Sequence, residues 1–299
     1  MSRARYKAYL YMLISSAIWG VAAPVIKFTL EGIDVLPFLT YRFIVAGLFS
    51  LPFVLFTNLK IPNKSRNLPL VILYGLFAFT IALGFLFVGL KQSTVLDLTL
   101  ITIISPLIVV AGGALVFRDT ITKREKMGIV IALLGVITVT LLPLYKGEDG
   151  IHFSGNIALL TFLVIDVVGV LIGKKLLKDG VHPAALTHWG FLVSGLVVTP
   201  FAIATIGAGP LWGTITTLEL QYHLGVWYMA LISGTLAYYL YVLGQKTIEV
   251  SEAALFKYLQ PIFAIPLAVL WLGEKFTLLF VVGGVIITIG IFIAESKRQ

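Results

Sequence analysis

Residues 250–290 read VSEAALFKYLQPIFAIPLAVLWLGEKFTLLFVVGGVIITIG, and residues 95–135 read VLDLTLITIISPLIVVAGGALVFRDTITKREKMGIVIALLG. A shift of 155 residues places one stretch on the other with prolines, glycines and acids in register. The matched pairs include Asp97 with Glu252, Pro106 with Pro261, Gly128 with Gly283, and Gly135 with Gly290. Proline and glycine positions reflect backbone requirements, so their register indicates an internal repeat and not a chance likeness between apolar segments.

The composition around these stretches is that of a membrane protein. The chain is 59% hydrophobic and 12% charged, with a mean hydropathy of +1.02. A soluble chain usually carries about 25% charged residues, so this surface is suited to lipid and not to water. Cysteine is absent, which excludes disulfides, thiolate catalysis and cysteine-bound metals.

Apolar runs of spanning length divide the chain into ten segments, because a helix crossing the hydrocarbon needs about 20 apolar residues. The predicted spans are residues 8–29, 36–57, 68–90, 94–117, 124–142, 156–177, 183–206, 222–244, 250–272 and 276–294. The sequence therefore predicts an all-α membrane protein with ten transmembrane helices.

The basic residues predict the orientation of these spans. Of the 22 Lys and Arg residues, 16 fall in segments that are cytoplasmic if the N-terminus lies inside, and three (Lys91, Lys146 and Lys275) fall outside. Cytoplasmic loops carry such an excess, so we expect both termini on the cytoplasmic side of the cell membrane. The net charge of +8 is thereby explained without a nucleic-acid partner.

The repeat divides the spans into two groups of five, residues 1–147 and 148–299. An odd number of spans turns the second copy over in the membrane, so the two five-helix repeats are predicted to be inverted. A weaker match between the first two spans and the sixth and seventh, with Pro37 near Pro183, agrees with this division. Inverted repeats are typical of secondary transporters, in which two halves open alternately to either side.

Several stretches resemble the EamA family of the drug/metabolite transporter superfamily. They are Ser15-Ser16-Ala17-Ile18-Trp19-Gly20 with Pro24 and Lys27, Tyr41-Arg42-Phe43, Glu252-Ala253-Ala254, Leu259-Gln260-Pro261, Leu272-Gly273-Glu274, and the helix from Gly283 to Gly290. The resemblance covers essentially the whole chain and implies transport of amino acids or other metabolites, without fixing the substrate. One departure is Arg118-Asp119, where the family usually shows Gly-Glu.

Ionisable groups inside the spans are functional candidates, because a charge in hydrocarbon is costly. Asp166 lies near the middle of the sixth span, and Gly169 and Gly173 share its helical face. A face of small residues packs against protein, so Asp166 is predicted to point inward. Two interpretations stay open: a proton-coupling carboxylate or anchor for a cationic group, and a structural hydrogen bond or ion pair.

A polar cavity is predicted where the fourth and ninth spans carry prolines, which free backbone carbonyls near the middle of the membrane. Deep aromatic residues are added as candidate walls, although such residues also serve as interface anchors. The predicted cavity residues are Trp19, Thr102, Ser105, Asp166, Tyr238, Tyr239, Lys257 and Gln260, with Pro106 and Pro261 as structural hinges. Two alternative roles stay open for Lys257: the ion-pair partner of Asp166, or a side chain that snorkels toward the membrane surface.

Three other charged residues are predicted to be structural. Lys27 and Arg42 lie toward the outer side, where either could attract a carboxylate or pair with Glu31, Asp34 or Asp97, and the structural pairing is favoured. Glu274 is placed at the start of the tenth helix, where the helix macrodipole stabilises an acid.

The function predicted from these features is a secondary-active or passive transporter of a small metabolite, working by alternating access and directed to export. An uncoupled channel-like facilitator is the alternative, and a membrane enzyme is disfavoured because the four histidines form no HExxH motif. No Walker sequence is present, so ATP is not the expected driver. We predict no catalytic residue and no metal or cofactor; the partners are a small-molecule substrate and the bilayer, with proton coupling and a monomeric or homodimeric state left open.

Overall fold

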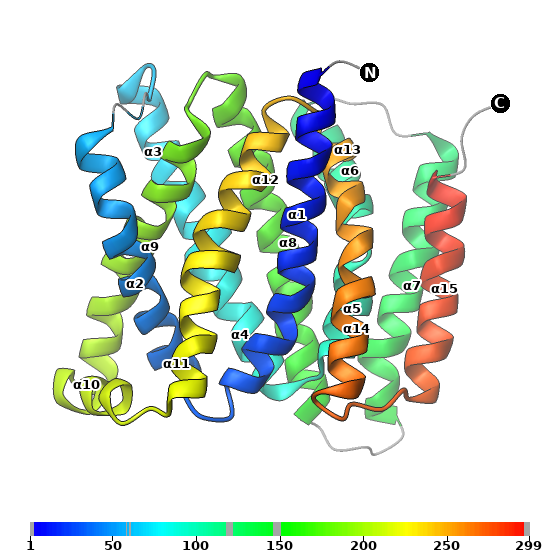
Figure 1. The fold of residues 1–299 in the computed structure, drawn as a ribbon. Helices are drawn as coiled ribbons and strands as arrows, with labels where there is room; N and C mark the ends of the chain where they lie inside the picture. The colour runs from blue at the N-terminus through cyan, green and yellow to red at the C-terminus, as the bar shows by residue number, and fades with distance from the viewer. Residues whose placement is uncertain (1–2, 58, 60, 118–121, 146–150, 296–299) are drawn as a thin grey trace.

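The computed structural model describes residues 3–57, 59, 61–117, 122–145 and 151–295, and every element assigned within them is helical. Figure 1 shows the helices standing side by side in one bundle. The elements are α1 (Arg3–Thr29), α2 (Val35–Phe56), α3 (Lys64–Tyr74), η1 (Gly75–Ile81), α4 (Ala82–Gln92), α5 (Val95–Thr102), α6 (Ser105–Phe117), α7 (Lys123–Tyr145), α8 (Ile151–Lys178), α9 (Pro183–Ile206), α10 (Ala208–Thr216), α11 (Leu220–Trp227), η2 (Tyr228–Leu236), α12 (Ala237–Gln245), α13 (Val250–Leu255), η3 (Phe256–Leu259), α14 (Gln260–Leu270) and α15 (Leu278–Glu295).

The bundle is a multi-pass membrane protein, as its composition predicts. Within the described residues, nine helical runs are long and apolar enough to cross a membrane. The fifth predicted span, residues 124–142, corresponds to α7, which begins with four charged residues and is not one of the nine, so the count of ten crossings stays a prediction. Large apolar side chains cover the outside: Phe56, Leu115 and Leu270 are each more than four-fifths exposed. Such a surface is stable only against lipid.

The first and last described residues, Arg3 and Glu295, lie at the same end of the bundle, which we call the terminal face (Figure 1). The other end is the opposite face. The short helix α10 lies at the opposite face between α9 and α11, in a segment that the sequence analysis treated as a loop. The remaining helical runs begin and end within five residues of the predicted spans.

The fourth and ninth spans are both broken, and the breaks fall at equivalent places. The fourth is interrupted at residues 103–104, between α5 and α6, and the ninth is tightened into the 3₁₀ segment η3 between α13 and α14. Each break directly precedes a proline, Pro106 or Pro261, whose ring nitrogen cannot donate to the preceding turn. In Figure 1 the two broken spans run in opposite directions.

The third and eighth spans share another irregularity, which the sequence did not predict. The third contains the π-helical segment η1 and the eighth contains the π-helical segment η2. A shift of 155 residues moves η1 onto η2. Wide turns of this kind loosen the regular hydrogen-bond ladder and are frequent at functional sites.

Glycines allow α7 and α15 to pack closely along their length. A Cβ on Gly290 would lie 2.7 Å from the carbonyl oxygen of Gly128, and one on Gly135 would lie 2.9 Å from that of Gly283. The 155-residue shift matches Gly128 with Gly283 and Gly135 with Gly290. It therefore also turns the contact between Gly128 and Gly290 into the contact between Gly283 and Gly135. Such an exchange is the pattern of a contact across a twofold axis.

We expect Gly290→Ala to destabilise the protein by about 1–3 kcal/mol, because its methyl group would collide with main-chain atoms of α7. The matched control is Gly284→Ala on the same helix, where the nearest atom, a methyl carbon of Leu100, would be at an ordinary 3.5 Å. Thermal unfolding in detergent measures both variants. Equal melting temperatures would contradict the close packing of α7 and α15.

Two lysines close helix ends in equivalent ways. Each ammonium group donates to two carbonyls at the end of another helical run, with all four N···O distances between 2.5 and 2.8 Å. The groups are Lys27 with Leu90 and Ser93 near the opposite face, and Lys174 with Gln245 and Ile248 near the terminal face. The acceptors in the two groups are 155 residues apart. Lys27 therefore serves the structure through main-chain oxygens and not through the acids that the sequence offered.

Candidate functional site: the central cavity

A cavity of about 120 Å³ lies inside the bundle, with room for several water molecules or a small solute. Among the described residues, its walls come from α1, α2, the α3–η1–α4 run, α5 and α6, α8, the η2–α12 run, and η3 with α14. Helices α7, α9, α10 and α15 contribute no described residue to these walls. The broken and π-helical spans thus surround the cavity, and the glycine-packed pair α7 and α15 lies outside it.

The structure brings most of the predicted cavity residues together. The ones that line the cavity are Trp19, Thr102, Ser105, Asp166, Tyr238, Lys257, Gln260 and the hinge residue Pro261. Tyr239 and Pro106 are not among the lining residues. Each follows a lining residue directly, and because successive residues on a helix point about 100° apart, the side chain at these two positions turns away from the cavity wall.

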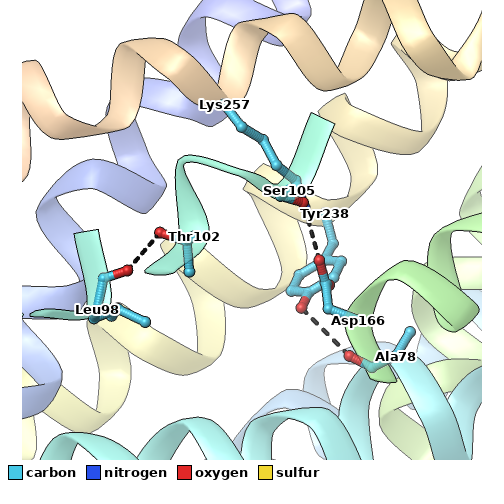
Figure 2. Close-up of polar contacts among 7 residues, drawn as sticks. All are labelled: Ala78, Leu98, Thr102, Ser105, Asp166, Tyr238 and Lys257. Carbon is cyan, nitrogen blue, oxygen red and sulfur yellow. Dashed lines mark hydrogen bonds and ion pairs between the residues drawn. The ribbon is translucent and has the colours of Figure 1, made fainter. Parts of the chain in front are cut away.

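A buried ion pair joins two walls of the cavity. Lys257 Nζ lies 2.7 Å from Asp166 Oδ2 and donates to Ser105 Oγ at 3.1 Å. The side chains of Lys257 and Asp166 are 11% and 15% exposed. Figure 2 shows Lys257 reaching from η3 toward Asp166 on α8, with Ser105 of α6 beside them. The ion-pair partnership considered from the sequence is therefore present, inside the cavity.

The two π-helical segments present carbonyls to aromatic side chains of the cavity. Trp19 Nε1 donates to the carbonyl of Ser233 in η2 at 3.0 Å. The hydroxyl of Tyr238 lies 3.5 Å from the carbonyl oxygen of Ala78 in η1 (Figure 2). Ala78 and Ser233 are 155 residues apart, so the carbonyls at equivalent positions of the two repeats each accept from an aromatic side chain of the cavity. Trp19 also packs edge-on against Tyr238, with ring centroids 5.0 Å apart, which fixes this wall.

The hydroxyl of Thr102 is satisfied within its own helix. Its Oγ1 donates to the carbonyl of Leu98 in its own helix at 2.8 Å, as Figure 2 shows. Hydroxyls near a helix break commonly satisfy backbone carbonyls in this way. Ser105, by contrast, directs its oxygen to Lys257.

Arg42 belongs to the cavity, although an ion pair with a nearby acid was its favoured role in the sequence. It lines the cavity, is only 1% exposed, and none of the described acids pairs with it. Its Nε and Nη1 have no hydrogen-bond partner among the described residues, and its guanidinium carbon lies 5.8 and 5.5 Å from the rings of Phe43 and Phe87. A usable signal was present: no residue three or four positions from Arg42 is acidic.

A model of the EamA-like transporter family matches residues 6–141 and again residues 153–295. The chain belongs to the EamA-like transporter family. The two matches fall inside the two predicted halves, 1–147 and 148–299. The departure at Arg118-Asp119 lies outside the described residues.

Relatives of this EamA-like transporter carry transporter names. An uncharacterized transporter of Archaeoglobus fulgidus is 25% identical, over 98% of this chain and all of that protein. A probable amino-acid metabolite efflux pump of Salmonella typhimurium is 26% identical, over 94% and 92% of the two chains, and one of Escherichia coli is 24% identical. A crystal structure with 16% identity covers 99% of this chain with a TM-score of 0.67, which shows the fold alone. These findings identify a membrane transporter and not an enzyme.

At the terminal face of the EamA-like transporter, an acid joins the two halves of the sequence. Glu252, in α13, accepts hydrogen bonds from Arg5 at 2.7 Å and from Tyr9, both in α1. At the opposite face the matched acid Asp97, in α5, accepts from Asn156 of α8 at 3.3 Å. Each acid thus links its own half to the first helix of the other half: Glu252 to α1, and Asp97 to α8.

Glu274 makes a further contact between the halves at the opposite face. Its two carboxylate oxygens accept from the backbone N–H groups of Val95 and Leu96, at 2.8 and 3.0 Å, and so cap α5. Burial raises the pKa of the Glu274 carboxyl above its usual value, and the two N–H donors oppose that rise. The expected structural role is present, but the helix it stabilises is α5 and not the tenth span, because α15 begins only at Leu278.

Proposed function

We propose that this EamA-like transporter is a carrier that exports a small organic solute, such as an amino acid or a related metabolite, by alternating access. The observation that carries the proposal is the cavity itself. Its described lining residues include three charged side chains within an apolar bundle, and the broken and π-helical spans of both halves contribute to its walls. Irregular backbone at membrane depth is typical of transporter binding sites.

The contacts at the two faces support alternating access. Contacts between the halves occur at both ends: Glu252 with Arg5 and Tyr9 at the terminal face, and Glu274 with α5 at the opposite face. Opening one face requires its contacts between the halves to break while those at the other face persist. The caps made by Lys27 and Lys174 join helices of the same half and would move with it.

Export of an amino acid or related solute is proposed from two considerations. The names of the Salmonella typhimurium and Escherichia coli relatives specify efflux of amino-acid metabolites. The excess of Lys and Arg residues predicts that the terminal face is cytoplasmic, so solute would enter the cavity from there and leave at the opposite face.

The purified protein in liposomes tests the carrier against the channel-like facilitator. Radiolabelled amino acids are offered outside vesicles that contain the same unlabelled amino acid, and uptake is measured as its concentration rises. A carrier gives saturable uptake that is accelerated by unlabelled solute on the far side. Uptake that rises linearly without acceleration would identify a channel, and equal uptake by empty liposomes would remove the transport proposal.

Proton coupling is proposed to run through Asp166, the one acid among the described lining residues. Protonation of Asp166 would release Lys257, so proton occupancy and the arrangement of α8 and η3 would be linked. We expect wild-type transport to depend on pH, and Asp166→Asn to transport at a rate that is independent of pH. Glu219→Gln, at an exposed position outside the cavity, is the matched control. An unchanged pH profile in Asp166→Asn would remove Asp166 from coupling.

A further inference from the structure

The charges of the cavity are unequal in number and separate in position. The described lining residues include two cations, Arg42 and Lys257, and one carboxylate, Asp166, which is taken by Lys257. Arg42 lies seven residues into α2 from the opposite face, and Lys257 lies seven residues from the start of α13 at the terminal face. At 1.5 Å per helical residue, each is about 10 Å inside its own face. The positive charge of Arg42 is therefore separate from the Lys257–Asp166 ion pair and lies nearer the opposite face.

The surroundings of Arg42 do not neutralise it. Its neighbours Phe43 and Phe87 offer aromatic rings, which attract a cation only weakly. An aromatic ring has no oxygen or nitrogen atom that could accept the in-plane N–H groups of the guanidinium. A guanidinium has five N–H donors, and here Nε and Nη1 have no acceptor among the described residues. A buried cation without a partner is strongly unfavourable. A protein retains such a group where a ligand supplies the opposite charge.

The geometry of a guanidinium selects the ligand chemistry. Its parallel N–H groups match the two oxygens of a carboxylate, and such bidentate pairs are the strongest hydrogen bonds that arginine forms. Apolar side chains such as Leu83, Leu86 and Met229 line the same cavity and suit a small apolar group on the solute.

We propose that Arg42 is the solute-binding residue that recognises a carboxylate, so that every transported solute carries one. The inference rests on the proposed transport function and narrows it to carboxylate-bearing solutes with a small apolar body. An amine that lacks a carboxylate is excluded, because it would add a positive charge to a cavity whose fixed charges already sum to +1.

The purified protein tests this with matched ligand sets built on methyl, isobutyl and benzyl side chains. Each set contains the amino acid, its deaminated carboxylic acid and its decarboxylated amine, and binding is measured as the rise in melting temperature. We expect the carboxylate-bearing members to raise the melting temperature and the amines to leave it unchanged. An amine that stabilises as well as its matched acid would overturn the proposal, and so would a panel in which no carboxylate stabilises.

Variants at Arg42 separate recognition from a merely structural role. Arg42→Met keeps an unbranched apolar stem; we expect it to lose the carboxylate-induced shift and to melt at a higher temperature than wild type without solute, because an unpaired buried charge is gone. A structural Arg42 predicts the opposite, a lower melting temperature. Arg42→Lys keeps the positive charge but loses the paired N–H groups of the guanidinium, so the affinity for carboxylates should fall by about tenfold. Arg66→Met, on an exposed arginine outside the cavity, is the control and should behave as wild type.

The counterflow experiment keeps the two proposals apart. If the wild-type protein exchanges amines as readily as their matched acids, the proposal of a carrier is supported and the proposal that Arg42 recognises a carboxylate is wrong. If no solute shows saturable exchange, the carrier itself falls. Carboxylate binding that disappears in Arg42→Met would then still identify an anion site.

Discussion

Replacing Lys257 by methionine should lower the free energy of unfolding by about 3–5 kcal/mol, the effect expected when one partner of a buried ion pair is removed. The substitution leaves the Asp166 carboxylate, only 15% exposed, without the ammonium group that lies 2.7 Å away. Unfolding in detergent, followed by circular dichroism against denaturant or temperature, measures the loss.

The double variant Asp166→Asn with Lys257→Met is the decisive companion. It removes both charges, so we expect it to recover much of the stability lost by the single variant. Ser105→Ala should have a smaller effect, because Ser105 supplies one hydrogen bond at 3.1 Å and no charge. Additive losses in the double variant would show that the ion pair contributes nothing to the fold.

Lys27→Met and Lys174→Met should each cost about 3 kcal/mol of stability, because each removes two charge-assisted hydrogen bonds to carbonyls that end a helical run. The four acceptors, Leu90, Ser93, Gln245 and Ile248, are main-chain oxygens that would be left without these donors. The two lysines make equivalent contacts, so the two losses should be similar in size. Thermal unfolding of the single variants measures them.

Lys175→Met is the matched control for this pair. Lys175 adjoins Lys174 on α8 but is exposed, so its removal should change stability by less than about 0.5 kcal/mol. A loss in Lys175→Met equal to that in Lys174→Met would show that the effect comes from the general charge of this helix end. Losses confined to Lys27→Met or Lys174→Met alone would contradict the equivalence of the two caps.

The sequence predicted the helical runs well because apolar length is a local property. A run of about 20 apolar residues has few alternatives to a membrane helix, which satisfies its own backbone hydrogen bonds. The helix breaks were also predictable, since Pro106 and Pro261 act within their own turns. The π-helical segments η1 and η2 were not, because no residue type requires a wide turn.

The cavity was predicted in part for a similar reason. Asp166 and Lys257 were found because an ionisable group within a span is unusual whatever surrounds it. Arg42 met the same criterion, but the sequence left two partners open, a nearby acid and an attracted carboxylate. Only the packing of α2 shows that none of the described acids reaches it. Lys27 was given acidic partners by the same reasoning and donates instead to carbonyls of another run.

The sequence by itself determined the lipid-facing character, the approximate spans and the repeat, because hydropathy and the spacing of proline and glycine act along the chain. The tertiary structure alone decided which charges are paired, since partners 91 residues apart, as in Lys257 and Asp166, meet only when helices pack. It also decided that Arg42 lines a cavity and that two of its nitrogen atoms have no acceptor among the residues that the structure describes. Electrostatic partnership depends on distance in space, and a one-dimensional pattern does not contain that distance.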